Sequence, residues 1–414
     1  MSRICSIPLL VFLLSCLGWV QAQEEPYELS YLLVRSSDGR VLHHREPDKL
    51  RVPASTLKLV TAVAALESLG GDYRFETTVV ASEKPEKSGV TTLVLCGEGD
   101  PELTEAALQE LADKLAASGI GRASRLAVDP GPYSFPPYGQ GWAWDDAGHG
   151  YAPEIGGLNT NGGIVELIPD SPPSWLHLSE GSPEGRWLVP GREGVEVRGE
   201  VPDSIAAPRP HLRTGEVLSR ILVRQKILEP GPIEIAPGQG RILAVHRSRP
   251  LRKLLKRALW ESDNLAMELF FRASSRSRPE ALKGAEVRIV DGSGLSRYNL
   301  ISARHLVAVL RANTELRELL PGAGEGTLKR RFLDGWAAYQ VRAKTGSMSN
   351  ISSLAGYLFP GTDRECVFAI MINGHLGKRS QRKELENRLL DEWAREVGWP
   401  YLTESHPSGQ KLTR

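Results

Sequence analysis

Three short groups of residues could together carry out acyl transfer, and they follow one another along the chain. Ser55 stands three positions before Lys58, and Ser262 stands two positions before Asn264. A lysine, a threonine and a glycine follow at Lys344–Gly346. A serine hydroxyl is a weak nucleophile until a neighbouring base removes its proton. The set therefore predicts a serine nucleophile activated by a lysine, with a second lysine nearby.

The first group lies at the predicted start of a helix. Residues 56–69 carry apolar side chains at helical spacing, and a glycine pair at 70–71 is typical of a helix end. Residues three apart share one face of a helix, so the Lys58 amine can reach the Ser55 hydroxyl. Burial and nearby positive charge lower the pKa of a lysine and so make it a base. Lys344 could supply that charge, and the helix N-terminus would favour a developing oxyanion.

Each group is unspecific when taken alone. The spacing of Ser55 and Lys58 recurs at Ser380–Lys383, on a predicted solvated helix face, and at Ser408–Lys411, in a polar tail. Ser55 could also be a helix cap, and Lys58 a solvated lysine. The ordered occurrence of all three groups, each in a fitting context, favours catalysis over these alternatives.

The elements that would position these residues predict an α/β fold, with an antiparallel sheet flanked by helices and a strand-rich insertion. The expected strands of the main sheet are residues 28–36, 41–44, 353–359 and 366–372. The expected helices are residues 56–69, 102–117, 214–228, 250–271 and 380–397. In the insertion, strand-like runs occur at residues 77–81, 91–95 and 125–128.

The chain is expected to divide into a signal peptide, a catalytic domain and an insertion. Residues 1–22 combine Arg3, an apolar run and a small-residue cleavage site, which is typical of export to the periplasm or cell envelope. A retained N-terminal anchor is the alternative, and no later segment is apolar enough to span a bilayer. The predicted divisions are 1–22 (signal peptide), 23–72 with 238–400 (catalytic), 73–237 (inserted) and 401–414 (polar tail).

Composition excludes several other classes of protein. The net charge of the 414 residues is +1, which argues against a nucleic-acid binder. Removal of the signal peptide leaves Cys96 and Cys366, which could pair or remain isolated buried thiols. Nine histidines are present without an HExxH pattern, so a metal hydrolase is poorly supported and no cofactor is implied.

Beyond these groups, the sequence resembles the class C low-molecular-mass penicillin-binding proteins, the D-alanyl-D-alanine carboxypeptidase/endopeptidase family. The likeness runs from about residue 28 to 398 and includes short segments outside the three groups. These segments are Gly97–Leu103 (GEGDPEL), Gly141–Asp146 (GWAWDD), Leu158–Asn161 (LNTN), Asp291–Leu300 (DGSGLSRYNL), Gly326–Leu328 (GTL) and Ala355–Tyr357 (AGY). The resemblance implies the penicillin-recognising serine transferase fold.

The resemblance also implies a role for each residue of the first two groups. Ser55 would form the acyl-enzyme, and Lys58 would be its base. Ser262 would relay protons, while Asn264 would hold a substrate amide. The substrates would be peptidoglycan stem peptides ending in D-Ala-D-Ala, and β-lactam antibiotics would bind at the same serine. The same acylation step would also cut a D-Ala–diaminopimelate cross-link.

The remaining residues would bind the substrate. Lys344 and Thr345 would hold its terminal carboxylate, and Gly346 completes that segment. The backbone N–H groups of Ser55 and Ser347 would form the oxyanion hole. Family positions that contact the substrate's side chain correspond to Asp146 and Arg297.

Two alternatives share the three groups. A class A β-lactamase needs a glutamate that activates the deacylating water, and Glu154 lies at a plausible distance, although its spacing to the next Leu-Asn is one residue too long. A catalytically silent cell-wall-binding protein would keep the pocket without the chemistry. The stretches between Lys58 and Ser262, and between Asn264 and Asp291, look short for the family, which predicts trimmed insertions.

Overall fold

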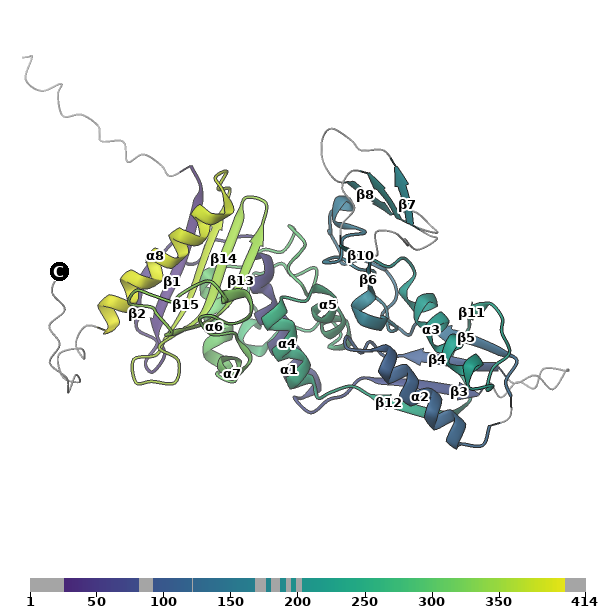
Figure 1. The fold of residues 1–414 in the computed structure, drawn as a ribbon. Coiled ribbons are helices and arrows are strands. Elements are labelled where there is room, and N and C mark those ends of the chain that lie inside the picture. The colour runs from purple at the N-terminus through teal and green to yellow at the C-terminus, as the bar shows by residue number, and fades with distance from the viewer. Residues whose placement is uncertain are drawn as a thin grey trace, which may run out of the picture.

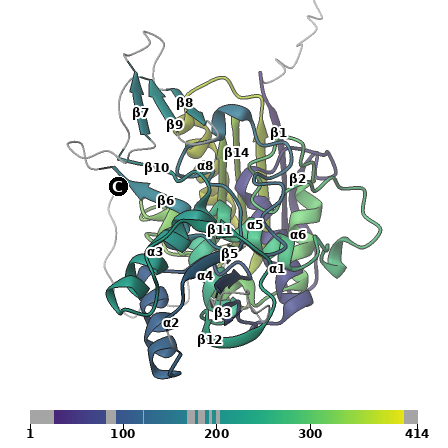
Figure 2. The same ribbon diagram turned by 90° about the vertical axis from the view of Figure 1, so that its right-hand side faces the viewer.

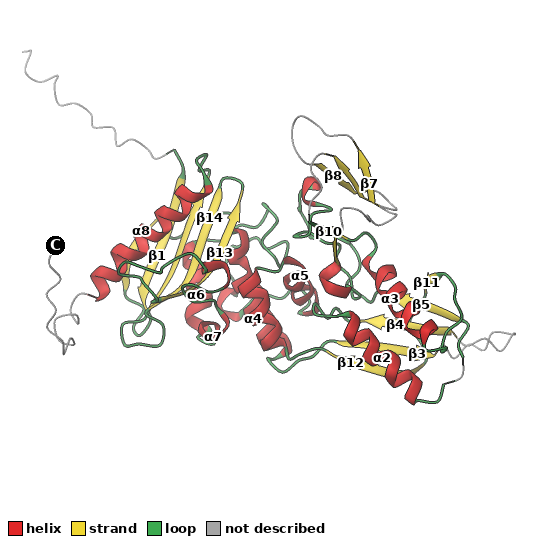
Figure 3. Ribbon diagram, viewed as in Figure 1, coloured by secondary structure: helices red, strands yellow, loops and turns green. Residues whose placement is uncertain are grey.

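The computed structural model describes residues 26–81, 92–120, 122–167, 176–179, 187–190, 195–198 and 203–398. Its main sheet has five strands in the order β13-β14-β15-β1-β2, and every neighbouring pair is antiparallel. The strands are β13 (Val341–Met348), β14 (Ile351–Leu358), β15 (Cys366–Asn373), β1 (Glu28–Arg35) and β2 (Val41–Arg45). The predicted α/β fold with an antiparallel sheet is confirmed (Figures 1 and 3).

Helices cover both faces of this sheet (Figure 1). On one face, α8 (Arg379–Gly398) packs Leu390 and Trp393 against Leu354 of β14. On the other face, Ala355 and Tyr357 of the same strand join the core of the remaining helices. Because both faces are covered, all eight residues of β14 are buried, including Ser352 and Ser353.

The helix that follows Ser55 is one of the helices that cover the second face of the main sheet. A short 3-10 turn, η1 (Ala54–Leu57), leads into α1 (Lys58–Leu69), which ends at Gly70 with a φ of 83°. The turn packs against β13 and β14. Around α1 lie α4 (Leu251–Glu261), α5 (Asn264–Ala273), α6 (Ala303–Ala312) and α7 (Leu316–Leu319).

The sequence predicts one helix over residues 250–271, but the structure has two. The chain breaks after α4, where Ser262 adopts a left-handed conformation with a φ of 61°. Asp263 then starts α5, because its carboxylate accepts a hydrogen bond from the Ala266 N–H. The apolar periodicity continues across the break, so periodicity alone could not reveal it.

The residues between α1 and α4 build a second sheet with its own core (Figure 1). The order is β11-β5-β4-β3-β12, and the helices α2 (Glu105–Ala117) and α3 (Pro210–Arg224) pack on it. Its strands are β3 (Glu76–Ala81), β4 (Thr92–Gly97), β5 (Arg125–Asp129), β11 (Ile233–Ile235) and β12 (Arg241–Arg247). The Thr104 hydroxyl caps α2, which starts three residues later than the predicted helix.

One strand beyond the predicted end of the insertion pairs with the inserted sheet. The sequence places the boundary at residue 237, but β12 pairs with β3 and so returns to the inserted sheet before the chain reaches α4. Strand pairing places β12 with the inserted sheet. The lower frequency of Gly and Pro after about residue 240 does not reveal this pairing.

Two smaller groups of strands lie above this sheet in the views of Figures 1 and 2. One pair joins β6 (Ile164–Glu166) to β10 (Ser204–Ala206), and another group has the order β7-β9-β8. The three strands of that group are β7 (Leu176–Ser179), β9 (Val195–Arg198) and β8 (Trp187–Pro190).

Three further predictions concern the ends of the chain and the cysteines. The predicted signal peptide and polar tail lie outside the described residues. Among the described helices, none is long and apolar enough to cross a bilayer. Cys96 and Cys366 are both free, and burial raises the pKa of each thiol to about 11.

Candidate active site

The structure brings the first two predicted groups together around the amine of Lys58. Its Nζ lies 3.0 Å from the Ser55 Oγ and 2.6 Å from the Asn264 Oδ1. A third contact, 2.6 Å long, reaches the backbone carbonyl of Ser293. One helical turn places Lys58 beside Ser55, as the spacing predicts. Asn264 comes from the first residue of α5, which packs directly on α1.

The loop that carries Ser293 is held by two buried carboxylates. Glu268 accepts hydrogen bonds from the N–H groups of Gly292 and Ser293, at 2.6 and 3.0 Å. Asp291 accepts hydrogen bonds from the Trp142 indole, at 2.9 Å, and from Asn299, at 2.7 Å. These contacts fix the carbonyl that faces Lys58. Sequence reasoning identified the segment by resemblance alone and missed both carboxylates as supports of the lysine.

The third predicted group lies across the same site, on an edge strand. The Lys344 Nζ is 3.0 Å from the Ser262 Oγ and 2.8 Å from the Thr345 carbonyl. Both lysine side chains are completely buried. The sequence analysis did not predict β13, which passes through Lys344 and Thr345 as a strand rather than ending there.

Two glycines allow backbone segments to approach Ser55 closely. A Cβ on Gly346 would lie 2.9 Å from the Ser55 nitrogen. A Cβ on Gly294, which has a φ of 79°, would lie 2.0 Å from the Ala54 carbonyl oxygen. Ala54 itself has a φ of 48°, a region that costs a residue with a side chain about 1–2 kcal/mol. The segment around Ser55 is thus held in a strained conformation by its neighbours.

Burial determines the charge properties of the two lysines. It lowers the pKa of Lys58 to about 8, while the carboxylates of Asp291, Asp263 and Glu268 act in the opposite direction. Burial also lowers the pKa of Lys344, and the positive charge of Lys58 adds to that shift. Both amines are therefore closer to the neutral form than exposed lysines are.

The two residues expected to contact the substrate's side chain lie beside this centre rather than in it. Asp146 accepts a 2.9 Å hydrogen bond from the Tyr151 hydroxyl. The carbonyl of Tyr151 accepts a 2.8 Å hydrogen bond from the Asn264 amide, so Asp146 is linked to the site through one residue. Arg297 is exposed and donates a 3.4 Å hydrogen bond to the Ser349 carbonyl, just past β13. Sequence reasoning missed Tyr151.

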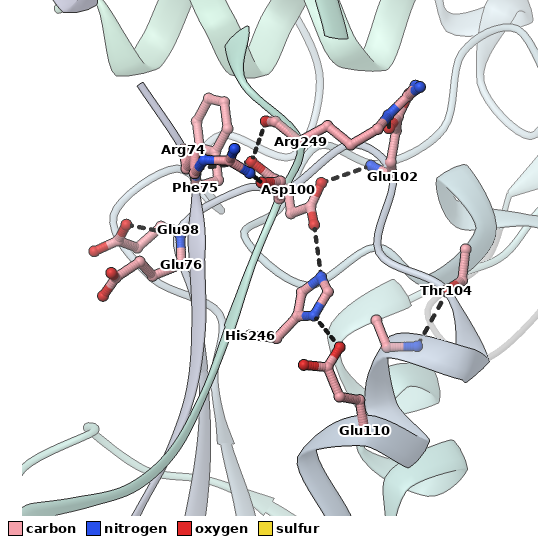
Figure 4. A network of polar contacts seen from close by, with 12 residues as sticks. Arg74, Phe75, Glu76, Glu98, Asp100, Glu102, Thr104, Glu110, His246 and Arg249 are labelled. Atoms are coloured by element: carbon pink, nitrogen blue, oxygen red, sulfur yellow. Dashed lines mark hydrogen bonds and ion pairs between the residues drawn. The ribbon is translucent and has the colours of Figure 1, made fainter. Parts of the chain in front are cut away.

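A polar network connects the inserted sheet to the junction between α4 and α5. Glu102 forms ion pairs with Arg249 and, at 2.7 Å, with Arg257 of α4. Arg257 reaches on to Asp263, at 2.9 Å. Figure 4 shows the part of the network around Glu102, in which the Asp100 carboxylate accepts a 2.9 Å hydrogen bond from the Glu102 N–H. Through Arg257, the Gly97–Leu103 segment therefore supports Asp263, which lies between Ser262 and Asn264.

A cavity of about 540 Å³ opens in front of these residues. Its lining includes Ser55 and Ser262 as well as Thr345, Gly346 and Ser347 of β13. The remaining lining residues come from the end of α4, the segment Gly326–Arg331, β14 and the start of α8. Each predicted group thus contributes at least one residue to this cavity. The lining residues Ser55 and Ser347 are almost 300 positions apart in the sequence.

Residues that would support the other classes of enzyme lie elsewhere. Glu154, the residue that a class A β-lactamase would need, does not line this cavity. Its carboxylate accepts a 3.2 Å hydrogen bond from the Arg209 N–H, and burial raises its pKa. Within the described ranges, no three His, Cys, Asp or Glu side chains are grouped so that they could hold a metal ion.

Comparisons with known proteins find relatives in both sequence and structure. The profile of the D-Ala-D-Ala carboxypeptidase 3 (S13) family matches residues 22–174 and 192–397. A D-alanyl-D-alanine carboxypeptidase of Actinomadura sp. is 30% identical over 421 residues, which cover 84% of this chain and 78% of that protein. The carboxypeptidase DacB of Haemophilus influenzae is 26% identical over 453 residues, with 90% and 92% covered.

Solved structures share the fold. Penicillin-binding protein 4 of Haemophilus influenzae superposes with a TM-score of 0.77 at 24% identity, covering 89% of this chain and 97% of that one. A predatory peptidoglycan endopeptidase of Bdellovibrio bacteriovorus superposes with a TM-score of 0.54 at 16% identity, covering 94% and 96%. The Haemophilus protein has also been solved in complex with a β-lactam.

Proposed function

Because the chain belongs to the D-Ala-D-Ala carboxypeptidase 3 (S13) family, we propose that it removes the terminal D-Ala of peptidoglycan stem peptides through an acyl-enzyme on Ser55. The observation that carries this mechanism is the 3.0 Å contact between the Ser55 Oγ and the Lys58 Nζ, at the wall of the cavity that also holds Thr345. A hydroxyl within hydrogen-bond distance of a base is the geometry that an activated nucleophile requires.

In the first step, Lys58 takes the hydroxyl proton as the Ser55 Oγ attacks the carbonyl carbon of the penultimate D-Ala. The C–N bond to the terminal D-Ala then breaks, and the leaving amine receives the proton that Lys58 had taken, by way of Ser262, whose hydroxyl lies 3.0 Å from Lys344. Lys58 is then neutral again. In the second step a water molecule loses a proton to Lys58 and attacks the ester carbonyl. The C–O bond breaks, Ser55 regains its proton, and the shortened peptide leaves with a new carboxylate.

The two lysines have different tasks in this scheme. Lys58 must be neutral when it accepts a proton, and burial favours that form. Lys344 and Thr345 would bind the terminal carboxylate of the substrate, whose negative charge favours the protonated form of Lys344. The N–H groups of Ser55 and Ser347 would hold the oxyanion, and Gly346 permits the approach of β13 to the Ser55 nitrogen.

The direct test compares the wild type with Ser55→Ala. Stem pentapeptides are offered to both proteins, and D-Ala release is followed by mass spectrometry. We expect the variant to lose about 10³-fold or more of the activity, because Ser55 carries the hydroxyl that Lys58 contacts. Full activity in the variant would refute the assignment of the nucleophile. Labelling with a fluorescent penicillin provides a second readout, and the adduct should map to Ser55.

The same labelling separates this function from the two alternatives. A silent cell-wall-binding protein would give no adduct at Ser55. A β-lactamase would form the adduct and release it quickly. We expect a long-lived adduct, because Glu154 lies outside the cavity and its carboxylate is held by the Arg209 backbone.

Location and domain division complete the proposal. An exported protein of the periplasm or cell envelope would meet these substrates, and residues 1–22 would serve as its signal peptide. We place the insertion between α1 and α4, since the sheet of β3, β4, β5, β11 and β12 has a separate core. N-terminal sequencing of the secreted protein checks the signal peptide, and limited proteolysis of the same protein checks the domain division.

A further inference from the structure

The cavity in front of Ser55 extends well beyond the residues that the reaction uses. Its walls continue along Trp260 and Glu261 of α4, past Thr327 and Lys329, and along Arg379 and Lys383 of α8. At about 540 Å³ it lies in the range of about 300–1,000 Å³ that accommodates drug-sized ligands, far more than one alanine needs.

This extension carries unpaired positive charge. Lys329, Arg379 and Lys383 all line it, and none of them forms an ion pair with another described residue. Both carboxylates of the lining already have arginine partners. Glu386 is 3.0 Å from Arg331, and Glu261 is 3.5 Å from Arg257.

The cations also repel one another. Burial lowers the pKa of Lys383, and the positive charges of Arg379 and Arg331 lower it further, against the opposing effect of Glu386. A bound anion would relieve this repulsion. The sequence placed Ser380–Lys383 on a solvated helix face, but the structure turns Lys383 towards the cavity that contains Ser55.

The position of the extension indicates which half of the substrate it would contact. In the proposed reaction, the carboxylate near Lys344 and Thr345 belongs to the group that leaves. The residues expected on the acyl side, Asp146, Arg297 and Asn264, do not line this cavity. Everything beyond Thr345 therefore lies on the side of the leaving group.

We propose that the extension between Lys329 and the pair Arg379 and Lys383 is a subsite for an anionic leaving peptide. This inference rests on the proposed function and specifies its substrate class. A single D-Ala would leave the extension empty, whereas the stem peptide released from a cross-link fills it and offers several carboxylates to the three cations. The subsite thus favours endopeptidase cleavage of cross-linked dimers whose leaving stem carries free carboxylates.

The test uses two cross-linked dimers that differ only in the leaving stem. The carboxylate next to the scissile bond, which Lys344 and Thr345 would bind, is free in both, and the other carboxylates of the leaving stem are free in one dimer and amidated in the other. We expect the wild type to cleave the free-carboxylate dimer with about tenfold higher kcat/KM, and added salt to reduce that preference. The variant Lys329→Gln/Arg379→Gln/Lys383→Gln should lose most of the preference while still releasing D-Ala from a pentapeptide.

A matched control removes three exposed positive charges that do not line this cavity, as Lys253→Gln/Arg388→Gln/Arg395→Gln. This variant should keep the wild-type preference. Fluorescent penicillin labelling checks each variant for an intact nucleophile. If the triple cavity variant is not labelled, Lys383→Gln alone and the salt dependence of the wild type decide the question.

The possible failures are distinct. Absence of labelling in the wild type would overturn the proposed function itself. A labelled wild type that cleaves both dimers equally, or that releases D-Ala yet cuts neither dimer, would overturn the subsite alone. Loss of the preference in the matched control would also overturn it, because general surface charge would then explain the effect.

Discussion

At the residue scale, the amine of Lys58 experiences opposing influences. Burial drives it towards the neutral form, and the carboxylates of Asp291, Asp263 and Glu268 favour the charged form. The result is a pKa of about 8, which leaves a substantial neutral fraction near neutral pH. A base with a pKa near the working pH combines availability with proton affinity.

The pH dependence of acylation follows from this value. In the proposed reaction only neutral Lys58 would accept the proton, so the rate of penicillin labelling should rise as the pH increases through about 8. Below that pH the rate should fall about tenfold per pH unit. The labelling rate can be measured between pH 5 and pH 10 by stopping the reactions at set times and resolving the products on gels. A flat profile across this range would show that Lys58 is not the base.

A second residue-scale prediction concerns Gly294. The change Gly294→Ala places a methyl group 2.0 Å from the Ala54 carbonyl oxygen, so the segment before Ser55 must move. We expect penicillin labelling to fall about 100-fold, since misplacement by about 1 Å has effects of that size. Gly284→Ala is the matched control, because Gly284 has a similar φ of 72° but no atom within 4 Å of the added Cβ. Equal labelling of the two variants would contradict the argument.

At the element scale, the junction of α4 and α5 holds Ser262 and Asn264 on opposite sides of a helix break. The break depends on the left-handed Ser262 and on the cap formed by Asp263. Arg257 connects that cap to Glu102 of the inserted region. The insertion therefore supports the site through a contact that lies outside the cavity.

This connection can be tested with two arginines that share one partner. Both Arg257 and Arg249 contact Glu102, but only Arg257 also contacts Asp263. Arg257→Gln should lower kcat for D-Ala release about three- to tenfold with little change in KM, because partly exposed ion pairs contribute modestly. Arg249→Gln should have a smaller effect. Steady-state kinetics on a pentapeptide distinguishes the two, and equal losses would argue against a positioning role.

At the scale of the whole molecule, a partly buried histidine links the second sheet to the helix that packs on it. His246 of β12 lies 3.6 Å from Asp100 and 3.1 Å from Glu110 of α2 (Figure 4). The Asp100 carboxylate, and to a lesser extent that of Glu110, raises the pKa of His246 against the opposing effect of burial. The protonated imidazole therefore stabilises the fold.

The stabilisation should depend on pH in a defined direction. Since the folded pKa is raised, the contribution is complete below the unfolded value of 6.5 and is lost as the pH rises through the folded value. Relative to the wild type, His246→Gln should lower the thermal midpoint by about 1 °C or more at pH 5.5, and by less at pH 9. Differential scanning calorimetry at the two pH values measures this difference. A larger loss at pH 9 would contradict the sign.

The sequence alone determined the fold class and the hairpin of β14 and β15, and it proposed three reactive groups that the structure brings close together. Helical periodicity places Lys58 one turn from Ser55 by local geometry, so no tertiary information is needed for that pair. The resemblance to a family added the segments around Asp100 and Asp291 to the parts of the chain expected to matter for function.

Only the tertiary structure decided what surrounds these groups. The helix break at Ser262, the return of β12 to the inserted sheet and the direction of Lys383 all depend on contacts between segments distant in the chain. The pKa of Lys58 likewise depends on burial by α5 and by the loop at Ser293, which no local pattern encodes. Spacing along the chain specifies neighbours within one helix, whereas burial and charge arise from packing between helices and strands.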